Sequence, residues 1–281
     1  MERLRELLDA ASAGRCVAWL NYRAYAGRLS GRPLDLAGGA QDFIMGTRDA
    51  QQLLQSDVLT LPLVDLYQSL FVGTAEPDVD GGSAVTRLRE LLAAEEPRST
   101  VVSVLEGLRS LYQLGPPLVV VSPSPTLWLR LLGAVEIDED MADAAAMYLA
   151  DALRALAQTA VSGIVLEEGP GLLLADPVSV YQAVWNVAQH YGWAVGIEAS
   201  DGATEQLLRQ PVDFVLRPNS ALADVSPYWS EGLLVGGGFD RGFWIDPEPF
   251  PADLPAAFGY GTIPEDAVPE VVLARLRAWG R

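Results

Sequence analysis

Residues 163–167 (GIVLE) and 194–198 (AVGIE) are short, uninterrupted apolar runs, and each ends on a glutamate. Apolar residues at successive positions indicate burial on both faces, as in a parallel strand that is covered by helices. Five similar runs occur elsewhere, at residues 16–20, 118–122, 213–217, 233–236 and 257–261. An eighth falls between residues 57 and 73, where VLTLPLV and SLFVG are alternative candidates. Most of the runs are followed by a polar or glycine-rich turn.

Stretches with the period of amphipathic helices lie between these runs. Asp176-Pro177 predicts the start of one helix, with an N-cap residue followed by proline at the first helical position. Eight alternating strands and helices predict an α/β fold, a single (β/α)₈ TIM barrel that spans residues 1–281. A doubly wound open sheet is the alternative, and no GxGxxG motif follows the first run to support it. The predicted helices cover residues 85–94, 100–113, 138–160, 177–191, 203–209 and 265–279.

The composition excludes several kinds of chemistry and several kinds of partner. A formal charge of −18 disfavours attachment to nucleic acid or to an anionic membrane. All 19 basic residues are arginine, which excludes Schiff-base chemistry on lysine. One histidine and one cysteine cannot assemble the usual zinc ligand sets. A carboxylate site for magnesium stays open but has no distinguishing signature here, and we expect neither a metal nor a cofactor. The oligomeric state is left open, and a homodimer is one candidate.

The sequence also bears on location and on one long connection. No apolar run approaches the ~20 residues of a membrane span, and the charged start does not resemble a signal peptide. Together with the single Cys16, this predicts a cytoplasmic protein. Residues 74–83 (TAEPDVDGGS) are either a mobile lid or a solvated connection.

Candidate catalytic residues are those that follow the strands, because chemistry in a parallel barrel gathers at the carboxyl ends of its strands. Glu198 directly follows an apolar run and has no acidic neighbour in sequence. Glu167 and Glu168 alternate, so one faces the barrel interior and the other faces the helices. We choose Glu168 because it lies later, at the lip, although an ion pair with an arginine explains it nearly as well. His190 falls near the end of a helix, at the opposite face, where we expect a structural role.

The other strand ends mix arginines with polar and acidic side chains. Such a mixture suits an anionic small molecule, because arginines hold carboxylate or phosphate groups in two-pronged fashion. These candidate substrate-binding residues are Asn21, Arg23, Arg28, Arg217, Asp240 and Arg241, and Tyr260 ends the eighth strand as a further catalytic candidate.

Four stretches, in this order along nearly the whole chain, resemble the uroporphyrinogen decarboxylase superfamily. Residues 19–28 (WLNYRAYAGR) are similar to the W-x-M-R-Q-A-G-R motif of that family, with one extra residue between the arginines. Residues 124–127 (SPTL) are similar to its G-A-P-W-T-L, and residues 235–240 (VGGGFD) to its Q-G-N-L-D-P. Residues 259–270 (GYGTIPEDAVPE) are similar to its closing G-H-G-I-L-P-x-T-P-x-E-N-V, which is the most specific of the four motifs.

The resemblance implies that Arg23 and Arg28 hold substrate carboxylates at the barrel mouth. This chain departs from the family at several site positions. Tyr260 replaces the histidine of the G-H-G motif, Glu168 replaces a serine, and Arg241 replaces the proline that follows the aspartate. The family also has a key aspartate after its second strand, for which Asp57 is the candidate here.

Zinc-dependent methyltransferases and cobalamin-independent methionine synthases are relatives within this superfamily. Glu198 and Ser200 stand where those relatives carry a His-x-Cys pattern, so we expect no activation of a thiol by zinc in this chain.

The leading hypothesis for function is a divergent enzyme of this superfamily, a carboxy-lyase. It would act on a carboxylate-bearing small molecule or tetrapyrrole by cofactor-free acid–base chemistry, with decarboxylation as the expected reaction. Two alternatives remain open. One is a glycoside hydrolase with two catalytic carboxylates. The other is a barrel that has lost its catalytic residues and acts as a binding or partner protein.

Overall fold

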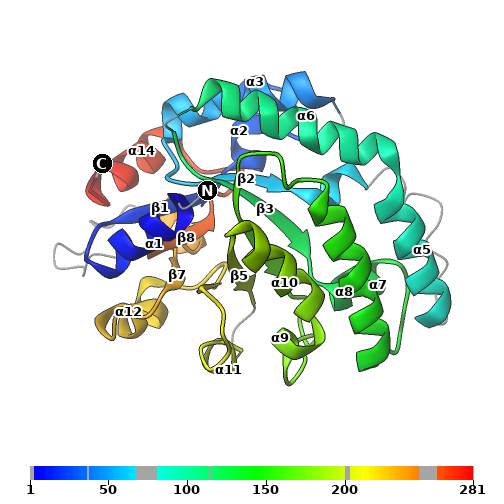
Figure 1. Ribbon diagram of the computed structural model, residues 1–281. Coiled ribbons are helices and arrows are strands. Elements are labelled where there is room, and N and C mark those ends of the chain that lie inside the picture. Colours follow the sequence, from blue (N-terminus) through cyan, green and yellow to red (C-terminus); the bar gives the residue numbers. More distant parts are fainter. Residues whose placement is uncertain are drawn as a thin grey trace.

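Eight parallel strands form the centre of the structure, which is a computed structural model and describes residues 3–36, 38–67, 81–113, 115–199, 203–246 and 258–280. The strands follow one another in the order β1-β8-β7-β6-β5-β4-β3-β2, and helices surround them (Figure 1). This arrangement confirms the predicted (β/α)₈ TIM barrel. The strands are β1 (Val17–Asn21), β2 (Leu59–Pro62), β3 (Leu118–Pro123), β4 (Val161–Glu167), β5 (Ala194–Glu198), β6 (Phe214–Leu216), β7 (Val235–Gly238) and β8 (Phe258–Thr262).

All seven predicted runs contain a strand, with ends that shift by at most two residues. The second strand lies within VLTLPLV, which settles the choice that the sequence left open. Residues 74–80, which belong to the predicted lid or connection, lie outside the described residues, and α5 begins at Gly81.

The helices include one for each of the six predicted stretches. The predicted helix at 177–191 is divided at Tyr181 into α9 and α10, and Asp176 caps α9 by accepting a hydrogen bond from Ser179 N at 3.1 Å. The helices α2, α3, α7, α12 and α13 were not predicted. The full set is α1 (Arg3–Ser12), α2 (Arg23–Ser30), α3 (Ala40–Leu54), α5 (Gly81–Ala93), α6 (Glu95–Leu111), α7 (Pro125–Leu131), α8 (Glu139–Arg154), α9 (Pro177–Val180), α10 (Gln182–Tyr191), α11 (Thr204–Leu207), α12 (Leu222–Ser230), α13 (Arg241–Ile245) and α14 (Pro269–Ala278), with a 3₁₀ turn, η1 (Leu63–Leu66).

Two apolar clusters occupy the two faces of the strands. The outer cluster packs between the strands and the helices and includes Ile164 and Leu166 of β4. The inner cluster fills the barrel and includes Val165 of the same strand. Its centre is aromatic, with the ring of Trp19 5.7 Å from that of Phe214, 6.2 Å from that of Phe258 and 5.8 Å from that of Tyr260.

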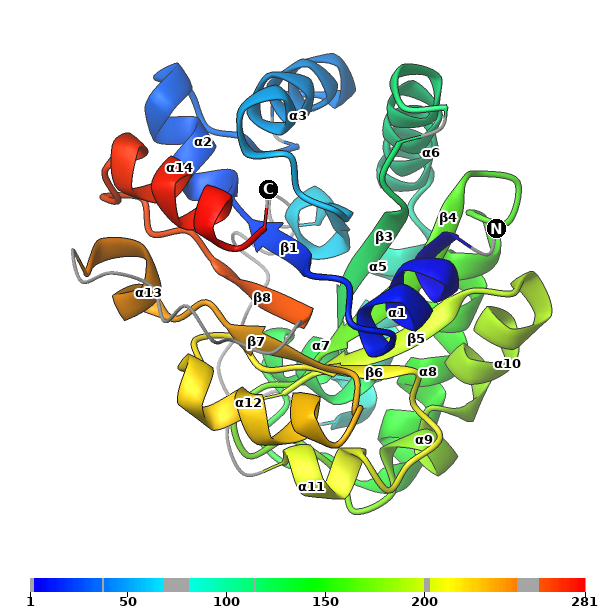
Figure 2. The same cartoon turned by 90° about the vertical axis from the view of Figure 1, so that its left-hand side faces the viewer.

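The helix α1 lies against the strands (Figure 2), and its apolar side chains belong to the inner cluster. Leu4, Leu7 and Leu8 are buried there. A Cβ atom at Gly163 in β4 would come within 2.4 Å of Leu4 Cδ2 and within 2.8 Å of the carbonyl oxygen of Ala194, and the backbone contact favours glycine at this position. The amino-terminal helix therefore closes one end of the barrel, and the catalytic candidates are expected at the other.

At the seam between β1 and β2 the two strands share no register of paired residues among the described positions, and one backbone hydrogen bond, from Asp57 N to the carbonyl oxygen of Ala18 at 2.9 Å, is supplemented by side chains. Ala18 N donates to Asp57 Oδ2 at 2.8 Å, and Leu20 N donates to Ser56 Oγ at 3.1 Å. Trp19 Nε1 donates to Thr60 Oγ1 at 2.9 Å. Side-chain oxygens thus satisfy the edge amides of β1 that a neighbouring strand would normally satisfy.

In the described part of the chain, no helix is both long enough and apolar enough to cross a membrane.

Candidate functional site

The alternation of side chains along the strands decides which residues face the barrel mouth. In β4, Val165 points into the barrel, so Glu167, two residues later, points the same way. In β5, Ala194 belongs to the inner cluster, and Glu198 has the same parity. Glu167 and Glu198 are also register partners on neighbouring strands. The strand ends therefore place two carboxyl groups side by side at the mouth.

Glu198 is hydrogen-bonded by the hydroxyl of Tyr260, which reaches Glu198 Oε2 from β8. Burial raises the pKa of Glu198 to about 7, and the charge of Glu167 adds to this effect, whereas the hydrogen bond from Tyr260 opposes it. Burial and the neighbouring carboxylates also hold the pKa of Tyr260 well above its ordinary value, so this hydroxyl stays protonated and donates. The pair thus offers a carboxyl group that exchanges its proton near neutral pH.

Glu167 connects this pair to a cation. Burial raises its pKa, the charge of Asp65 raises it further, and the charge of Arg23 lowers it. Asp65 forms an ion pair with Arg23 Nη2, and its side chain is only 8% exposed. Arg23 also donates from Nε to the carbonyl oxygen of Leu34 at 3.2 Å. The guanidinium is therefore held in place from two sides, between the first and second strands.

A cleft with a volume of about 650 Å³ opens beside this ion pair. It brings together three of the predicted substrate-binding residues, Asn21, Arg23 and Arg28. Arg28 lies 5.5 Å from the ring of Tyr25 and donates to the carbonyl oxygen of Ala267 at 2.7 Å. Arg23 and Asp65 line the cleft and also influence the pKa of Glu167, whereas Glu167 and Glu198 are not among the residues that line it.

Glu168 lies in a different environment from the one that the sequence suggested. Its backbone follows the parity of Ile164 and Leu166, and it faces the helices instead of the barrel. Its Oε2 accepts hydrogen bonds from Ser124 Oγ at 2.9 Å and Thr126 Oγ1 at 3.2 Å. Thr126 also bonds to the hydroxyl of Tyr181 at 2.9 Å. The pKa of Glu168 is raised by burial to about 7, although these hydrogen bonds lower it.

Three further predicted residues lie outside the cleft. Arg217 donates to the carbonyl oxygen of Asp224 and lies over the ring of Tyr228. Asp240 caps α13 by accepting from Phe243 N at 2.8 Å. Arg241 forms an exposed ion pair with Asp266 at 2.6 Å.

His190 lies in the last turn of α10, near the helix end that the sequence predicted, and its side chain is exposed.

Asp57, the candidate for the family's key aspartate, precedes β2 and bonds to the backbone of β1, away from the mouth. Asp65 follows β2 instead and lies at the mouth.

The structure thus adds two residues, Glu167 and Asp65, that were not selected from the sequence. Glu167 has a parity signal, because it lies two residues after Val165, but both faces of that strand are apolar and the sequence does not reveal which face is inside. Asp65 can be recognised as a residue that follows a strand only once the second strand is known to be Leu59–Pro62.

The donors that relatives would use for zinc do not fit here. Among the described residues, no three His, Cys, Asp or Glu side chains form a group that could hold a metal ion. Cys16 precedes β1, His190 ends α10, and Ser200 lies outside the described residues. Glu198, in place of the relatives' histidine, is already engaged by Tyr260.

No protein-family model matches this sequence, and no curated protein does. Solved structures with a similar fold include a methyltransferase from Methanosarcina mazei, at 14% identity and a TM-score of 0.63, covering 97% of this chain and 96% of that one. Another is a B12-independent methionine synthase from Shewanella sp. W3-18-1 in complex with selenomethionine, at 14% identity and a TM-score of 0.52, covering 87% of this chain and 86% of that one. At 14% identity, these similarities show a shared barrel fold.

Proposed function

We propose that this chain is a divergent enzyme of the uroporphyrinogen decarboxylase superfamily that acts on a carboxylate-bearing small molecule by cofactor-free acid–base chemistry. The observation that carries the proposal is the half-buried Glu198, whose pKa is raised to about 7 beside Glu167 and Tyr260. General acid–base catalysis is most efficient when the pKa of the catalytic group lies near the working pH.

The residues divide into two tasks in this proposal. Arg23 and Arg28 bind the carboxylate of the substrate in the cleft, where Arg23 exchanges part of its contact with Asp65 for the ligand. Protonated Glu198 is the general acid, and Tyr260 orients its carboxyl group. In a decarboxylation, the bond between the substrate carbon and its carboxylate breaks and CO₂ leaves. The substrate carbon keeps the bonding electron pair and takes up the proton of Glu198. Glu167 keeps that proton on Glu198 through its negative charge.

A thermal-shift screen tests the anion-binding part of this proposal, because specific ligands stabilise a protein in proportion to their affinity. The unmodified chain should be stabilised by some members of a set of carboxylated metabolites and porphyrinogens. Arg23→Gln and Arg28→Gln should each reduce that ligand-induced shift, with a loss of about tenfold in affinity for a lost charge-assisted contact. Arg241→Gln, which removes an exposed arginine of the same end of the barrel, is the matched control and should leave the shift unchanged.

The proposal fails if no carboxylated compound stabilises the unmodified chain, or if the two cleft variants respond as Arg241→Gln does. Ligand-induced stabilisation without turnover and without release of CO₂ would support the alternative of a binding protein.

A hydrolase of glycosides is a second candidate, favoured by one observation. Glu167 and Glu198 are register partners on adjacent parallel strands, which lie about 5 Å apart, and retaining glycosidases hold their two carboxyl groups at about that separation. Hydrolysis of chromogenic glycosides that disappears in both Glu167→Gln and Glu198→Gln would favour this reading over decarboxylation.

A further inference from the structure

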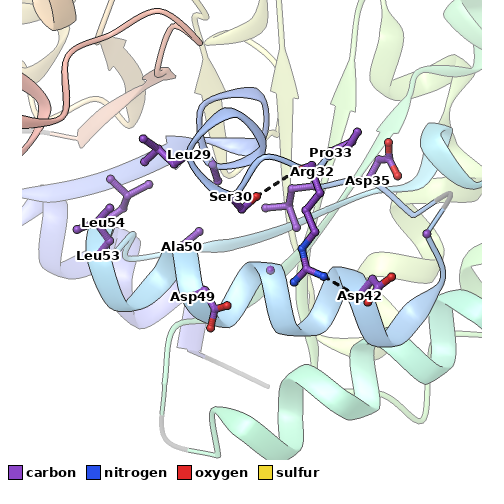
Figure 3. A pocket seen from close by; sticks show the side chains of 14 residues that line it. Leu29, Ser30, Arg32, Pro33, Asp35, Asp42, Asp49, Ala50, Leu53 and Leu54 are labelled. Carbon is purple, nitrogen blue, oxygen red and sulfur yellow. Dashed lines mark hydrogen bonds and ion pairs between the residues drawn. The ribbon is translucent and has the colours of Figure 1, made fainter.

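A groove with a volume of about 510 Å³ lies between α2 and α3, outside the barrel mouth (Figure 3). Its floor and one wall come from α3, and the other wall comes from the end of α2 and the segment that follows it. Half of the 14 lining residues are apolar. These seven are Ala26, Leu29, Pro33, Leu34, Ala50, Leu53 and Leu54.

The apolar end of the groove is open to solvent. Leu29 and Leu53 are each 43% exposed, and both line the groove. In Figure 3 their side chains gather near Leu54, away from the ion pair between Arg32 and Asp42. Exposed leucines that line one concavity are typical of sites that take up an apolar group.

The charged end of the groove is acidic. Asp35, Asp42 and Asp49 line the groove together with one arginine, Arg32, and Asp49 also pairs with Arg48 at 2.7 Å. The ion pair of Arg32 with Asp42 spans 3.6 Å between two side chains that are each more than half exposed, so its attraction is weak and leaves Asp42 able to bind another cation. Apolar walls and an acidic rim are complementary to a molecule with an apolar body and a positive head.

We propose that this α2–α3 groove is a second ligand site, for a small organic cation with an apolar body. The size of the groove favours a small molecule over a protein partner. A volume near 500 Å³ lies within the range of small-molecule sites, which is about 300–1,000 Å³. A stable protein interface buries more than about 1,000 Å² of surface, and the three apolar side chains at the open end provide only a small part of that.

The groove shares a wall with the cleft at the barrel mouth, and the two sites are otherwise separate. Arg32, Pro33, Leu34 and Asp35 line both. The side chain of Leu34 forms part of the groove, and its carbonyl oxygen accepts the hydrogen bond from Arg23 Nε. A ligand in the groove therefore contacts the segment that holds Arg23, although its binding does not depend on the reaction proposed for the mouth.

Three compounds with one apolar body and different heads test the charge preference. 4-Phenylbutylamine is a cation at neutral pH, 4-phenylbutanol is neutral, and 4-phenylbutyrate is an anion. Isothermal titration calorimetry on the full chain should show the tightest binding for the amine, about fivefold weaker binding for the alcohol, and none for the acid. Equal affinity for the amine and the alcohol, or no binding of the amine, overturns the proposal.

Matched variants place the binding in the groove. Asp42→Asn with Asp49→Asn should reduce the affinity for the amine to that for the alcohol. Asp143→Asn with Asp151→Asn removes two exposed charges from α8, where Asp151 pairs with Arg154 much as Asp49 pairs with Arg48. This control should leave the affinity for the amine unchanged, and equal losses in the two double variants would show non-specific attraction to an acidic chain and overturn the proposal.

Leucine variants test the apolar end independently of charge. Leu53→Asn should weaken the binding of the amine and of the alcohol alike. Leu111→Asn, at a similarly exposed leucine outside the groove, should leave the binding of both compounds unchanged. Because both leucines are about half exposed, each variant is expected to fold, and circular dichroism confirms this before titration. Unchanged binding to folded Leu53→Asn contradicts the assigned site.

Discussion

At the scale of the residue, Asp65 has two effects on the mouth, and both are testable. Its charge raises the pKa of Glu167, and its carboxylate forms an ion pair with the guanidinium of Arg23. Asp65→Asn should therefore lower the pKa of Glu167 and, by freeing Arg23, strengthen the binding of carboxylated ligands. Carbon-13 NMR of the glutamate side chains measures the first effect, with Glu167→Gln to assign the resonance.

The matched control for this prediction is Asp266→Asn, which frees Arg241 in an exposed pair. An unchanged titration of Glu167 in Asp65→Asn, or the same change in the control, would disprove the role given to Asp65.

The residue scale is also where prediction from sequence was least complete. Glu198 and Tyr260 could be selected because Glu198 ends an apolar run and Tyr260 lies one residue before the end of another, and the structure brings them into contact. The choice between Glu167 and Glu168 depended on which strand face lies inside the barrel. The sequence does not reveal which face of β4 points inward, because both faces are apolar and both are buried, one in the barrel interior and one against the helices.

At the scale of the element, the seam between β1 and β2 depends on side-chain oxygens. Ser56 is buried, and its hydroxyl accepts the hydrogen bond from Leu20 N. Ser56→Ala leaves that amide without its partner and should lower the free energy of unfolding by about 1–3 kcal/mol. Urea unfolding measures the loss, and the amide of Leu20 should exchange its hydrogen faster.

Ser110→Ala is the control, because Ser110 is exposed and only bonds back to the carbonyl of Glu106 in its own helix. It should change the stability by less than about 0.5 kcal/mol. A Ser56→Ala protein as stable as this control would show that the seam does not depend on the hydroxyl.

Strands were easier to predict than helices for a physical reason. A buried parallel strand is a continuous apolar run in the sequence. A helix, by contrast, is recognised by apolar residues that recur as a stripe along one of its faces. The buried face of α3 carries Thr47 and Gln51 between Phe43 and Leu54, which interrupts that stripe. The helices α7 and α13 have only seven and five residues, too few to establish a period.

At the scale of the whole molecule, buried carboxyl groups make stability depend on pH. Glu168 and Glu198 have pKa values raised from 4.5 to about 7, so the folded chain binds more protons than the unfolded chain between these values. The free energy of unfolding must then fall as the pH rises from about 4.5 to 7, by on the order of 3 kcal/mol for each group. Repulsion within a chain of charge −18 acts in the same direction.

Urea unfolding between pH 5 and pH 8 measures this loss. Glu168→Gln and Glu198→Gln should each flatten the pH dependence, because glutamine cannot ionise, and Glu205→Gln, at an exposed glutamate, should not. A stability that is constant or rises with pH would contradict the burial of both carboxyl groups.

The fold of the whole molecule could be predicted from the sequence because it follows from the number and order of the apolar runs. The site could be predicted only in part, since its residues come from strands β1, β4, β5 and β8 and the turn after β2, and their meeting depends on barrel closure and register. Position at a strand end selected Arg23 and Glu198, and it also selected Asp240, whose carboxylate caps a helix.

The titration of Glu198 tests the central claim most directly, because the proposed chemistry requires a carboxyl group that holds a proton near neutral pH. Carbon-13 NMR of the glutamate side chains, with Glu198→Gln to identify the resonance, measures this pKa in the absence of any substrate. The geometry predicts a midpoint near pH 7, which moves upward in Tyr260→Phe because the hydrogen bond that favours the ionised form is lost. A midpoint near the ordinary value of 4.5 would contradict the proposed role of Glu198 as the general acid.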